Sequence, residues 1–268
     1  MNILVCIKQV PDTTQVKIDP VKHTLIREGV PSIVSTFDTY AVETGLRLKE
    51  ANGGKVTIVS MGPPKAVEAV SECLSVGADE GWLVSGRKFG GSDTLATSRI
   101  LAEAVRVLEK KNGEKFDIII CGKQAIDGDT GQVGPEMAQH LGLPLITCAV
   151  EVTAEGDRLA AKRSSDEGYD IYDVKMPALI TMDKPAYDMR YPSIKNFLKV
   201  YRGEVTVSTL TDEDVVVPEG QCGLKGSPTK VRKTFTPVHE KNGMKIDSAT
   251  AKEAASTLMD LLESAKLI

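Results

Sequence analysis

The sequence predicts an α/β fold with a doubly wound, mostly parallel sheet, followed by an extended C-terminal arm and a helix. Apolar strand-like runs alternate with amphipathic helical patterns as far as residue 204. This alternation is typical of a parallel sheet with helices on both faces. Beyond that point the apolar periodicity is lost. We therefore predict an α/β domain over residues 1–204 and an arm with its helix over residues 205–268.

Six apolar runs have the length and composition of strands. They lie at Asn2–Ile7, Lys55–Ser60, Gly81–Val84, Phe116–Cys121, Pro144–Val150 and Ala178–Met182. Runs that are apolar at nearly every position, such as Ile118 to Cys121, are expected where a strand is covered on both faces. The polar runs Arg158–Arg163 and Tyr169–Val174 predict an antiparallel excursion after the fifth strand.

Amphipathic patterns between the strands predict helices at Asp38–Ala51, Pro64–Val76 and Asp93–Lys110. Each pattern ends at or near a glycine, which commonly terminates a helix. A last helix is expected over Thr250–Ala265, where alanines and leucines share one face. The preceding residues 205–241 are rich in Thr, Pro, Lys and Val and cannot build a core of their own. This arm packs either on its own domain or on a partner subunit, and the sequence leaves both alternatives open.

Composition indicates a globular cytoplasmic protein. The chain has 268 residues, of which 41% are hydrophobic and 26% charged, and its net charge is −4. This charge argues against nucleic acid as a partner. No apolar run approaches the roughly 20 residues that cross a bilayer, and no signal-peptide cleavage site follows the first strand, so we expect no membrane insertion. The cysteines and histidines show no metal-ligand spacing, so we expect no metal site.

Residues 116–136 are the most informative stretch and read FDIIICGKQAIDGDTGQVGPE. A buried strand leads into a glycine-rich acidic turn and then into a helix start with Pro135 in its first turn. The glycines let the backbone approach a ligand closely, and free N–H groups at a helix N-terminus attract anions. Asp127 and Asp129 lie where a ribose hydroxyl could bind. The stretch therefore predicts an adenine-nucleotide-binding site, while an ordinary polar strand-to-helix loop is the alternative.

The stretch Gly90–Thr94 opens another predicted helix. Ser92 or Asp93 fits a helix cap. Alternatively, Thr94 and Thr97 share a helical face and supply hydroxyls to a pyrophosphate. We discount a similarity to the phosphate loop of ATP pyrophosphatases, because that loop follows a first strand and this stretch lies mid-chain.

The first strand ends at Lys8–Thr13, and ligands collect at such strand ends in open α/β sheets, although a plain Pro-Asp turn explains the same residues. Ser35 and Asp38 are either ligand contacts or helix caps. No nucleophile with a base and no pair of carboxylates stands out, so we assign no catalytic residue. A nucleotide site without catalytic groups indicates that a cofactor performs the chemistry.

Together these stretches resemble the β subunit of electron-transfer flavoproteins over nearly the whole chain. The strongest similarity is Gly122–Val133, which looks like the nucleotide-binding loop of that family. Further similar stretches are Met61–Pro63, Ser75–Asp79 and Pro177–Thr181. Gly223–Thr229 resembles the arm that embraces the α subunit of a heterodimer. Lys8–Thr13 and Asp93–Thr97 look like the electron-bifurcating group.

The resemblance implies a cofactor and a mechanism. In ordinary members the site holds a structural AMP, and in bifurcating members it holds a second FAD that accepts hydride from NADH. One electron then goes to ferredoxin or flavodoxin, and the other goes through an FAD of the α subunit to a partner flavin dehydrogenase. We expect the bifurcating alternative, in which this chain is catalytic only together with the α subunit and that partner.

The resemblance also implies the cofactor contacts. The adenosine side would be lined by Cys6, Ser35, Asp38 and Met61. The pyrophosphate would be contacted by Thr94 and Thr97. The loop would contribute Cys121, Gly122, Lys123, Gln124 and Ala125, and on its phosphate and ribose side Asp127, Gly128, Asp129, Thr130, Gly131, Gln132 and Val133.

The segment Asp183–Ile194 resembles the part of the family that recognises partner dehydrogenases. Many members place a large aliphatic residue near Ala186 as the anchor for an acyl-CoA dehydrogenase. Alanine is small, so the anchor is either missing here or displaced to Tyr187 or Met189. The expected partner is a relative of acyl-CoA dehydrogenases or a different flavoenzyme, such as a lactate dehydrogenase.

Two other functions compete with bifurcation. One is a plain electron carrier of the same family, with AMP in this subunit. The other is a nucleotide-dependent enzyme or nucleotide-sensing module on the same fold. The extended arm argues against a self-contained sensor, because it implies a permanent partner.

Overall fold

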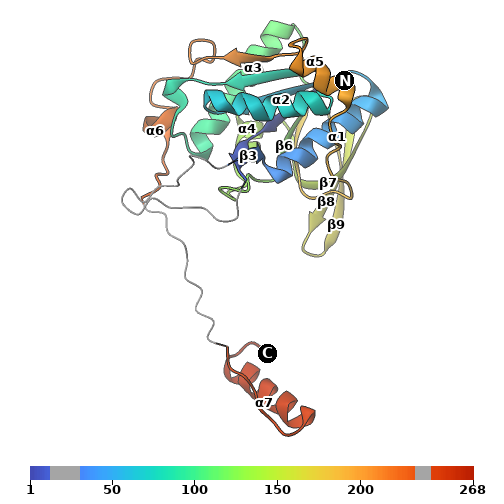
Figure 1. Ribbon diagram of the computed structural model, residues 1–268, viewed down its shortest axis with the longest axis vertical. Coiled ribbons are helices and arrows are strands. Elements are labelled where there is room, and N and C mark those ends of the chain that lie inside the picture. The colour runs from blue at the N-terminus through green and yellow to red at the C-terminus, as the bar shows by residue number, and fades with distance from the viewer. Residues whose placement is uncertain (13–30, 233–242) are drawn as a thin grey trace. The chain divides into compact units, whose positions relative to one another are not determined.

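The structure is a computed structural model, and it describes residues 1–12, 31–232 and 243–268 (Figure 1). Thr13, the last residue of the predicted turn after the first strand, lies outside the described residues. The chain divides into two compact units. The larger unit reaches Arg232, and the smaller one contains the C-terminal residues up to Ile268.

In the described residues, nine strands form one sheet in the order β11-β5-β4-β1-β6-β10-β7-β8-β9. They are β1 (Asn2–Ile7), β4 (Lys55–Met61), β5 (Glu80–Val84), β6 (Ile118–Gly122), β7 (Leu145–Glu155), β8 (Arg158–Ser165), β9 (Gly168–Lys175), β10 (Ala178–Met182) and β11 (Val207–Leu210). Neighbouring strands from β11 to β7 are parallel, whereas β8 and β9 are antiparallel. The predicted mostly parallel sheet is therefore confirmed. A separate antiparallel pair, β2 (Gln9–Pro11) and β3 (Ser32–Val34), follows β1.

Helices cover both faces of the sheet. The main ones are α1 (Thr36–Asn52), α2 (Val67–Val76), α3 (Thr94–Asn112) and α4 (Val133–Leu141), with short 3-10 turns η1 (Pro64–Ala66) and η2 (Arg87–Phe89). Successive side chains of a strand point to opposite faces. Along β1, Ile3 and Val5 pack in the same cluster as α1 and α2, whereas Leu4 and Cys6 pack with α3 and α4. Each large apolar side chain buried in this way contributes about 1.5–3 kcal/mol, which is why β1 is apolar at successive positions.

The order of the strands reverses at β1. From β1 the chain crosses to β4 and β5 on one side, and it then returns to β6 on the other side. The carboxyl ends of β1 and β6 therefore flank the switch point, where open α/β sheets bind ligands. The helix α4 follows β6 directly, and α1 packs against β6.

The predicted strands and helices are present with ends shifted by a few residues. The largest shift is at β7, which extends to Glu155 because it continues into the antiparallel hairpin with β8. Figure 1 shows β8 and β9 projecting from the sheet as a long hairpin. Sequence reasoning missed β11 and α5 (Ile194–Tyr201). The four-residue strand β11 is too short to show a period, and α5 has no fully buried residue, so both depend on packing against neighbours.

The segment after residue 204 packs on the α/β domain further than the sequence indicates. The strand β11 pairs with β5, and Leu210 and Val215 are buried in the same cluster as α3. A short helix, α6 (Gly223–Gly226), follows. The compact unit therefore ends near Arg232, whereas the sequence places its border at residue 204.

The smaller unit contains α7 (Ala251–Ser264), close to the predicted last helix. Thr250 caps this helix, and its side chain accepts the backbone N–H of Glu253 at 3.3 Å. The helix has no buried residue, and Leu258 and Met259 are about half exposed at 48% and 51%. Within the described residues of its own unit, the apolar side chains of this helix are therefore not covered.

Candidate functional site

The side chain of Asp38, in the first turn of α1, joins the carboxyl ends of β1 and β6. Asp38 Oδ2 accepts the backbone N–H of Lys8 at 2.8 Å, and Oδ1 accepts that of Gly122 at 3.1 Å. Position 122 requires glycine, because a Cβ would lie 2.3 Å from Asp38 Oδ1 and 2.7 Å from the carbonyl carbon of Phe37. The helix α1 therefore begins directly on the switch point of the sheet.

Asp38 is a carboxyl group whose surroundings oppose its ionisation. The residue is 6% exposed. This burial raises the pKa of Asp38 to about 7, although the hydrogen bonds from Lys8 and Gly122 act in the opposite direction. Asp38 therefore changes its protonation state near neutral pH, directly between the ends of two central strands.

The loop 122–133 is a folded turn that is held to α1. Ile126 donates its backbone N–H to Ser35 Oγ at 3.2 Å. Gly128 and Asp129 both donate to the carbonyl of Ala125, at 3.3 Å and 2.9 Å. Asp129 has a φ of 52°, a left-handed conformation that Asp tolerates better than most residues. Hydrogen bonds within the chain thus hold the loop in a defined conformation.

The two carboxylates predicted to bind ribose already have partners within the chain. Asp127 Oδ1 accepts from Lys8 Nζ at 2.6 Å, and Asp129 Oδ1 accepts from Gln124 Nε2 at 2.8 Å. A carboxylate has about four acceptor positions, so each of them retains capacity for a ligand hydroxyl. These contacts hold the carboxylates of Asp127 and Asp129 in place within the loop.

The start of α4, which the sequence predicts as an anion-binding element, presents free backbone N–H groups. Within the described part of the chain, the backbone N–H groups of Thr130 to Gly134 donate to no protein acceptor. Gly134 lets this helix start approach the sheet, because a Cβ there would lie 2.7 Å from Thr181 Cγ2. Free N–H groups at the positive end of a helix dipole bind phosphate.

The start of α3 lies beside the start of α4. Thr94 Oγ1 donates to Gln132 Oε1 at 3.3 Å and also lies 3.5 Å from Glu136 Oε1. Thr97 is one turn further along α3 and is half-buried. The structure therefore brings the mid-chain stretch beside the loop, and the predicted contact of Thr94 and Thr97 with a pyrophosphate stays a prediction. Glu136 was not predicted, and burial raises its pKa.

The other end of the loop is tied to β10. Lys123 donates its backbone N–H to the carbonyl of Met182 at 2.7 Å, and its Nζ lies 2.9 Å from Asp183 Oδ2. The hydrogen bond with Asp183 raises the pKa of Lys123. Because Asp183 begins the segment that resembles the partner-recognition region, the loop and that segment are in direct contact.

Three further predicted residues lie at the ends of central strands. Cys6 and Cys121 are paired neighbours on β1 and β6, and both are buried. A hydrogen bond with Cys6, together with burial, raises the pKa of Cys121, so the thiol of Cys121 behaves as a small apolar group. Met61 ends β4, and Ser60 beside it is buried without a hydrogen-bond partner among the described residues. Ser60 was missed because one serine in a strand gives no signal.

The segment after β10 folds back on α1. Tyr187 Oη lies 2.9 Å from Thr44 Oγ1, and Met189 packs against the core. These two side chains, proposed from the sequence as displaced anchors, thus point inward, whereas Ala186 is exposed. The large exposed apolar side chains of this region follow immediately: Tyr191, Ile194, Phe197 and Tyr201 are 93%, 80%, 53% and 79% exposed. We call these four residues the α5 patch.

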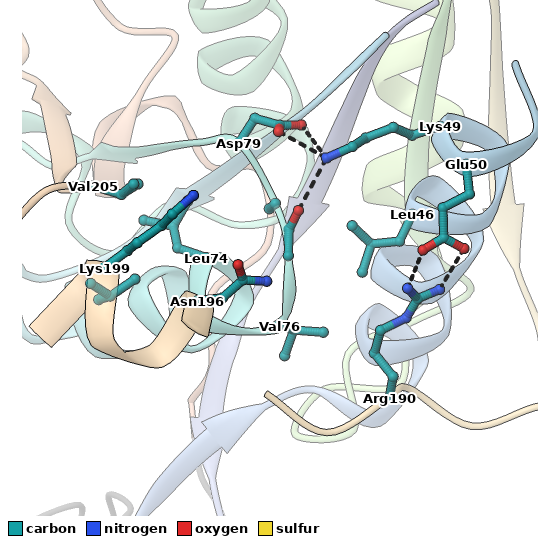
Figure 2. A pocket seen from close by; sticks show the side chains of 13 residues that line it. Leu46, Lys49, Glu50, Leu74, Val76, Asp79, Arg190, Asn196, Lys199 and Val205 are labelled. Atoms are coloured by element: carbon teal, nitrogen blue, oxygen red, sulfur yellow. Dashed lines mark hydrogen bonds and ion pairs between the residues drawn. The ribbon is translucent and has the colours of Figure 1, made fainter. Parts of the chain in front are cut away.

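A cavity of about 490 Å³ lies elsewhere, between α1, α5 and the turn from α2 to β5. Figure 2 shows that its charged groups are mostly paired: Lys49 contacts Asp79, and Arg190 contacts Glu50. The cavity lies near the amino end of β5, and none of the predicted cofactor residues lines it. Among the described residues, no group of three or more His, Cys, Asp or Glu side chains is placed to hold a metal ion.

The fold and the site define a doubly wound α/β protein with a glycine-rich loop and a helix start with free N–H groups at the switch point of its sheet. The family model for the electron transfer flavoprotein domain matches residues 22–213. The chain is 47% identical to the electron transfer flavoprotein subunit beta of Megasphaera elsdenii and to that of Thermoanaerobacterium thermosaccharolyticum, in both cases over 100% of each chain. It is 42% identical, again over 100% of each chain, to the caffeyl-CoA reductase-Etf complex subunit CarD of Acetobacterium woodii.

The chain therefore belongs to the electron transfer flavoprotein family and is a β subunit of that family. Its general function is electron transfer, and the family implies an α subunit and a dehydrogenase-type partner. In the described residues, no helix is long and apolar enough to cross a membrane.

Proposed function

We propose that this β subunit binds FAD at the loop 122–133 and, with its α subunit, takes electrons from NADH and bifurcates them. When bound, FAD would supply hydride acceptance and one-electron transfer to ferredoxin or flavodoxin and to the flavin of the α subunit. The roles of the chain itself are to bind the nucleotide, to orient it and to hold it beside the partner segment.

The residues present fit a dinucleotide. The adenosine side would lie over the strand ends near Asp38 and Met61, where the buried hydroxyl of Ser60 lacks a partner. The free N–H groups at the start of α4 would bind one phosphate. The contact of Thr94 with Gln132 places a second helix start beside the first. AMP has one phosphate, so this second helix start is the observation that favours FAD over AMP.

The experiment that tests this proposal is a cofactor count. We expect two FAD and no AMP per heterodimer when the chain is co-purified with its α subunit and the acid extract is quantified for both. One FAD with one AMP would instead identify a plain electron carrier. No flavin together with ATP turnover would identify a nucleotide-dependent enzyme of another class.

The partner flavin dehydrogenase is proposed to bind the α5 patch. Apolar residues exposed together in this way commonly mark a protein interface. The relative from Acetobacterium woodii is named as a subunit of a complex with a reductase, and we propose a comparable assembly here. The candidates are an acyl-CoA dehydrogenase relative and a flavin-dependent lactate dehydrogenase.

Two isoleucines of equal exposure test the α5 patch. Ile194 on α5 is 80% exposed and Ile171 on β9 is 79% exposed. We expect Ile194→Asp to weaken dehydrogenase binding to the heterodimer about tenfold or more, because a buried charge without a partner is costly at an interface. Ile171→Asp should change the affinity less than twofold. Biolayer interferometry with an acyl-CoA dehydrogenase and with a lactate dehydrogenase measures both, and equal effects of the two variants would contradict the assignment.

A further inference from the structure

The start of α3 is bound by the chain segment 222–229, which we call the arm root. Asp93 caps α3, and its Oδ1 accepts the backbone N–H of Ala96 at 3.0 Å. The other oxygen, Oδ2, accepts the backbone N–H of Thr229 at 2.9 Å and the Thr229 hydroxyl at 2.6 Å. The carboxylate of Asp93 therefore accepts hydrogen bonds both from its own helix and from Thr229, which lies 136 residues away in the sequence.

Further contacts make the arm root a fitted part of the domain. Asp93 donates its backbone N–H to Ser227 Oγ at 2.9 Å, and Gly223 donates to Ser92 Oγ at 2.9 Å. Ser227 is 4% exposed. Gly223 has a φ of 61°, and a Cβ there would lie 2.3 Å from the carbonyl oxygen of Lys88. The close approach thus requires glycine at this position.

Asp93 is held as a carboxylate in this arrangement. Burial alone would raise its pKa, but the hydrogen bonds from Thr229 and Ala96 outweigh burial, and the pKa of Asp93 is lowered. The hydroxyl of Thr229 is therefore bound to a charged acceptor, and such hydrogen bonds are stronger than those between neutral groups.

The next residue of α3 faces the nucleotide loop. Thr94 follows Asp93 directly, and its hydroxyl donates to Gln132 at the end of the loop 122–133. Asp93 thus connects Thr229, which contacts its Oδ2, with the first turn of α3, which its Oδ1 caps. The arm root therefore lies two hydrogen-bonded steps from the nucleotide loop, without itself contacting it in the described structure.

We propose that Thr229 is a positioning residue that acts through Asp93 to place the start of α3 against the second phosphate of FAD, so that the arm root helps to select FAD over AMP. This inference rests on the proposed function. AMP would occupy the adenosine side and the start of α4, so its binding does not need α3 in a fixed position. FAD would need both helix starts.

The test compares FAD and AMP binding to the heterodimer after removal of nucleotide from the β subunit, with α-subunit flavin retained. We expect Thr229→Val to weaken FAD binding about tenfold, because the variant removes one hydrogen bond to a charged group. AMP affinity should change less than twofold. Thr229→Ser keeps the hydroxyl and should restore FAD affinity. Thr211→Val, which removes another threonine hydroxyl bound to an aspartate, Asp214 Oδ2 at 2.9 Å, is the matched control and should leave both affinities unchanged.

Each result has a separate meaning. Unchanged FAD affinity in Thr229→Val would overturn the inference, as would an equal loss of FAD and AMP binding, which would indicate a purely structural role. A wild-type heterodimer that binds AMP and not FAD would overturn the proposed function itself. The binding measurement on the wild-type protein alone reveals this outcome. Thermal unfolding of each variant identifies a general loss of fold.

Discussion

At the scale of single residues, the site contains positions where close contacts with neighbouring atoms allow only one type of amino acid. Gly122 and Asp38 are the clearest pair. The glycine lets α1 reach the end of β6, and the carboxyl of Asp38 then accepts the N–H groups that the ends of β1 and β6 would otherwise leave unpaired. Removing a partner from a buried hydrogen-bonding group costs about 1–3 kcal/mol.

Substitution of Gly122 by Ala is expected to destabilise the fold by about 2–3 kcal/mol, because the added Cβ would overlap the start of α1 and the core cannot relax freely. Gly128→Ala, in the same loop, is the matched control. A Cβ at Gly128 would meet nothing within 4 Å, so that variant should change the free energy of unfolding by less than about 0.5 kcal/mol. Urea unfolding measures the free energy of unfolding of both variants, and a similar loss of stability in the two would contradict the predicted contact.

The pH dependence of stability should contain a contribution from Asp38. Its pKa is about 7 in the folded protein against an ordinary value of 3.8, so the folded state binds this proton more tightly than the unfolded state does. The contribution to stability is therefore complete below about pH 4, and it is lost as the pH rises through about 7. Asp38→Asn should abolish this loss. Urea unfolding between pH 5 and 8 measures it, and curves with the same slope for both proteins would refute the assignment.

At the scale of elements, α1 connects the loop 122–133 with the segment 183–194. Its first turn holds Ser35 and Asp38 against the loop, and its middle holds the segment through Glu43, which is 2% exposed. Arg190 donates to Glu43 from its Nε and Nη2, both at 2.9 Å, and from its backbone N–H at 3.1 Å. The α5 patch begins at the next residue, so its position depends on this ion pair.

Arg190→Gln is expected to destabilise the fold by about 3 kcal/mol, because it leaves the buried carboxylate of Glu43 with much less compensation. Arg47→Gln is the control. Arg47 makes one contact with Glu43, at 2.8 Å, and its side chain is 52% exposed, so about 1 kcal/mol is expected. Chemical unfolding measures both. Hydrogen exchange of residues 191–201 should rise only in Arg190→Gln, because Arg47 reaches the segment at Tyr187, where its guanidinium carbon lies 4.0 Å from the centre of the ring. Equal exchange in the two variants would show that Arg190 does not position the segment.

At the scale of the whole molecule, the chain combines one well-packed α/β unit with a smaller unit whose helix has no buried residue. The larger unit reaches Arg232 and has cores on both faces of its sheet. The helix α7 exposes apolar side chains that a 26-residue stretch, 243–268, cannot cover alone. We propose that this helix packs on the α subunit, and that the full chain is poorly stable without that subunit.

A chain shortened after Arg232 is expected to keep the fold of the larger unit and to lose the α subunit. Its melting temperature should differ from that of the isolated full-length chain by no more than a few degrees, because no buried residue is removed from the described part of the chain. Co-expression with tagged α subunit followed by gel filtration measures association. Stable heterodimer formation by the shortened chain would contradict the role given to α7, and a full-length chain unaffected by the α subunit would contradict the predicted instability.

Several features of the site could be predicted from the sequence because their signals are local. The buried run Ile118–Cys121, the glycines after it and Pro135 define a strand, a turn and a helix start within 20 or so residues. The cofactor role of Thr94 and Thr97 rests on similarity to the bifurcating group and stays a prediction, whereas the contact of Thr94 with Gln132 is visible only in the structure. In contrast, Glu136 and Ser60 were missed because their significance lies in burial, which a single sequence does not display.

The sequence by itself determined the fold class, the parallel sheet and the family, because apolar periodicity and glycine-rich turns depend on residues that are close together in the chain. The tertiary structure decided what depends on distant segments. It placed the border of the compact unit at Arg232 rather than at residue 204, since β11 forms only by pairing with β5. It turned Tyr187 and Met189 inward and exposed Ile194 and its neighbours, because the Arg190 contacts with α1 fix that segment. It also brought Thr229 to Asp93, a contact between residues too far apart in sequence for any local pattern to indicate.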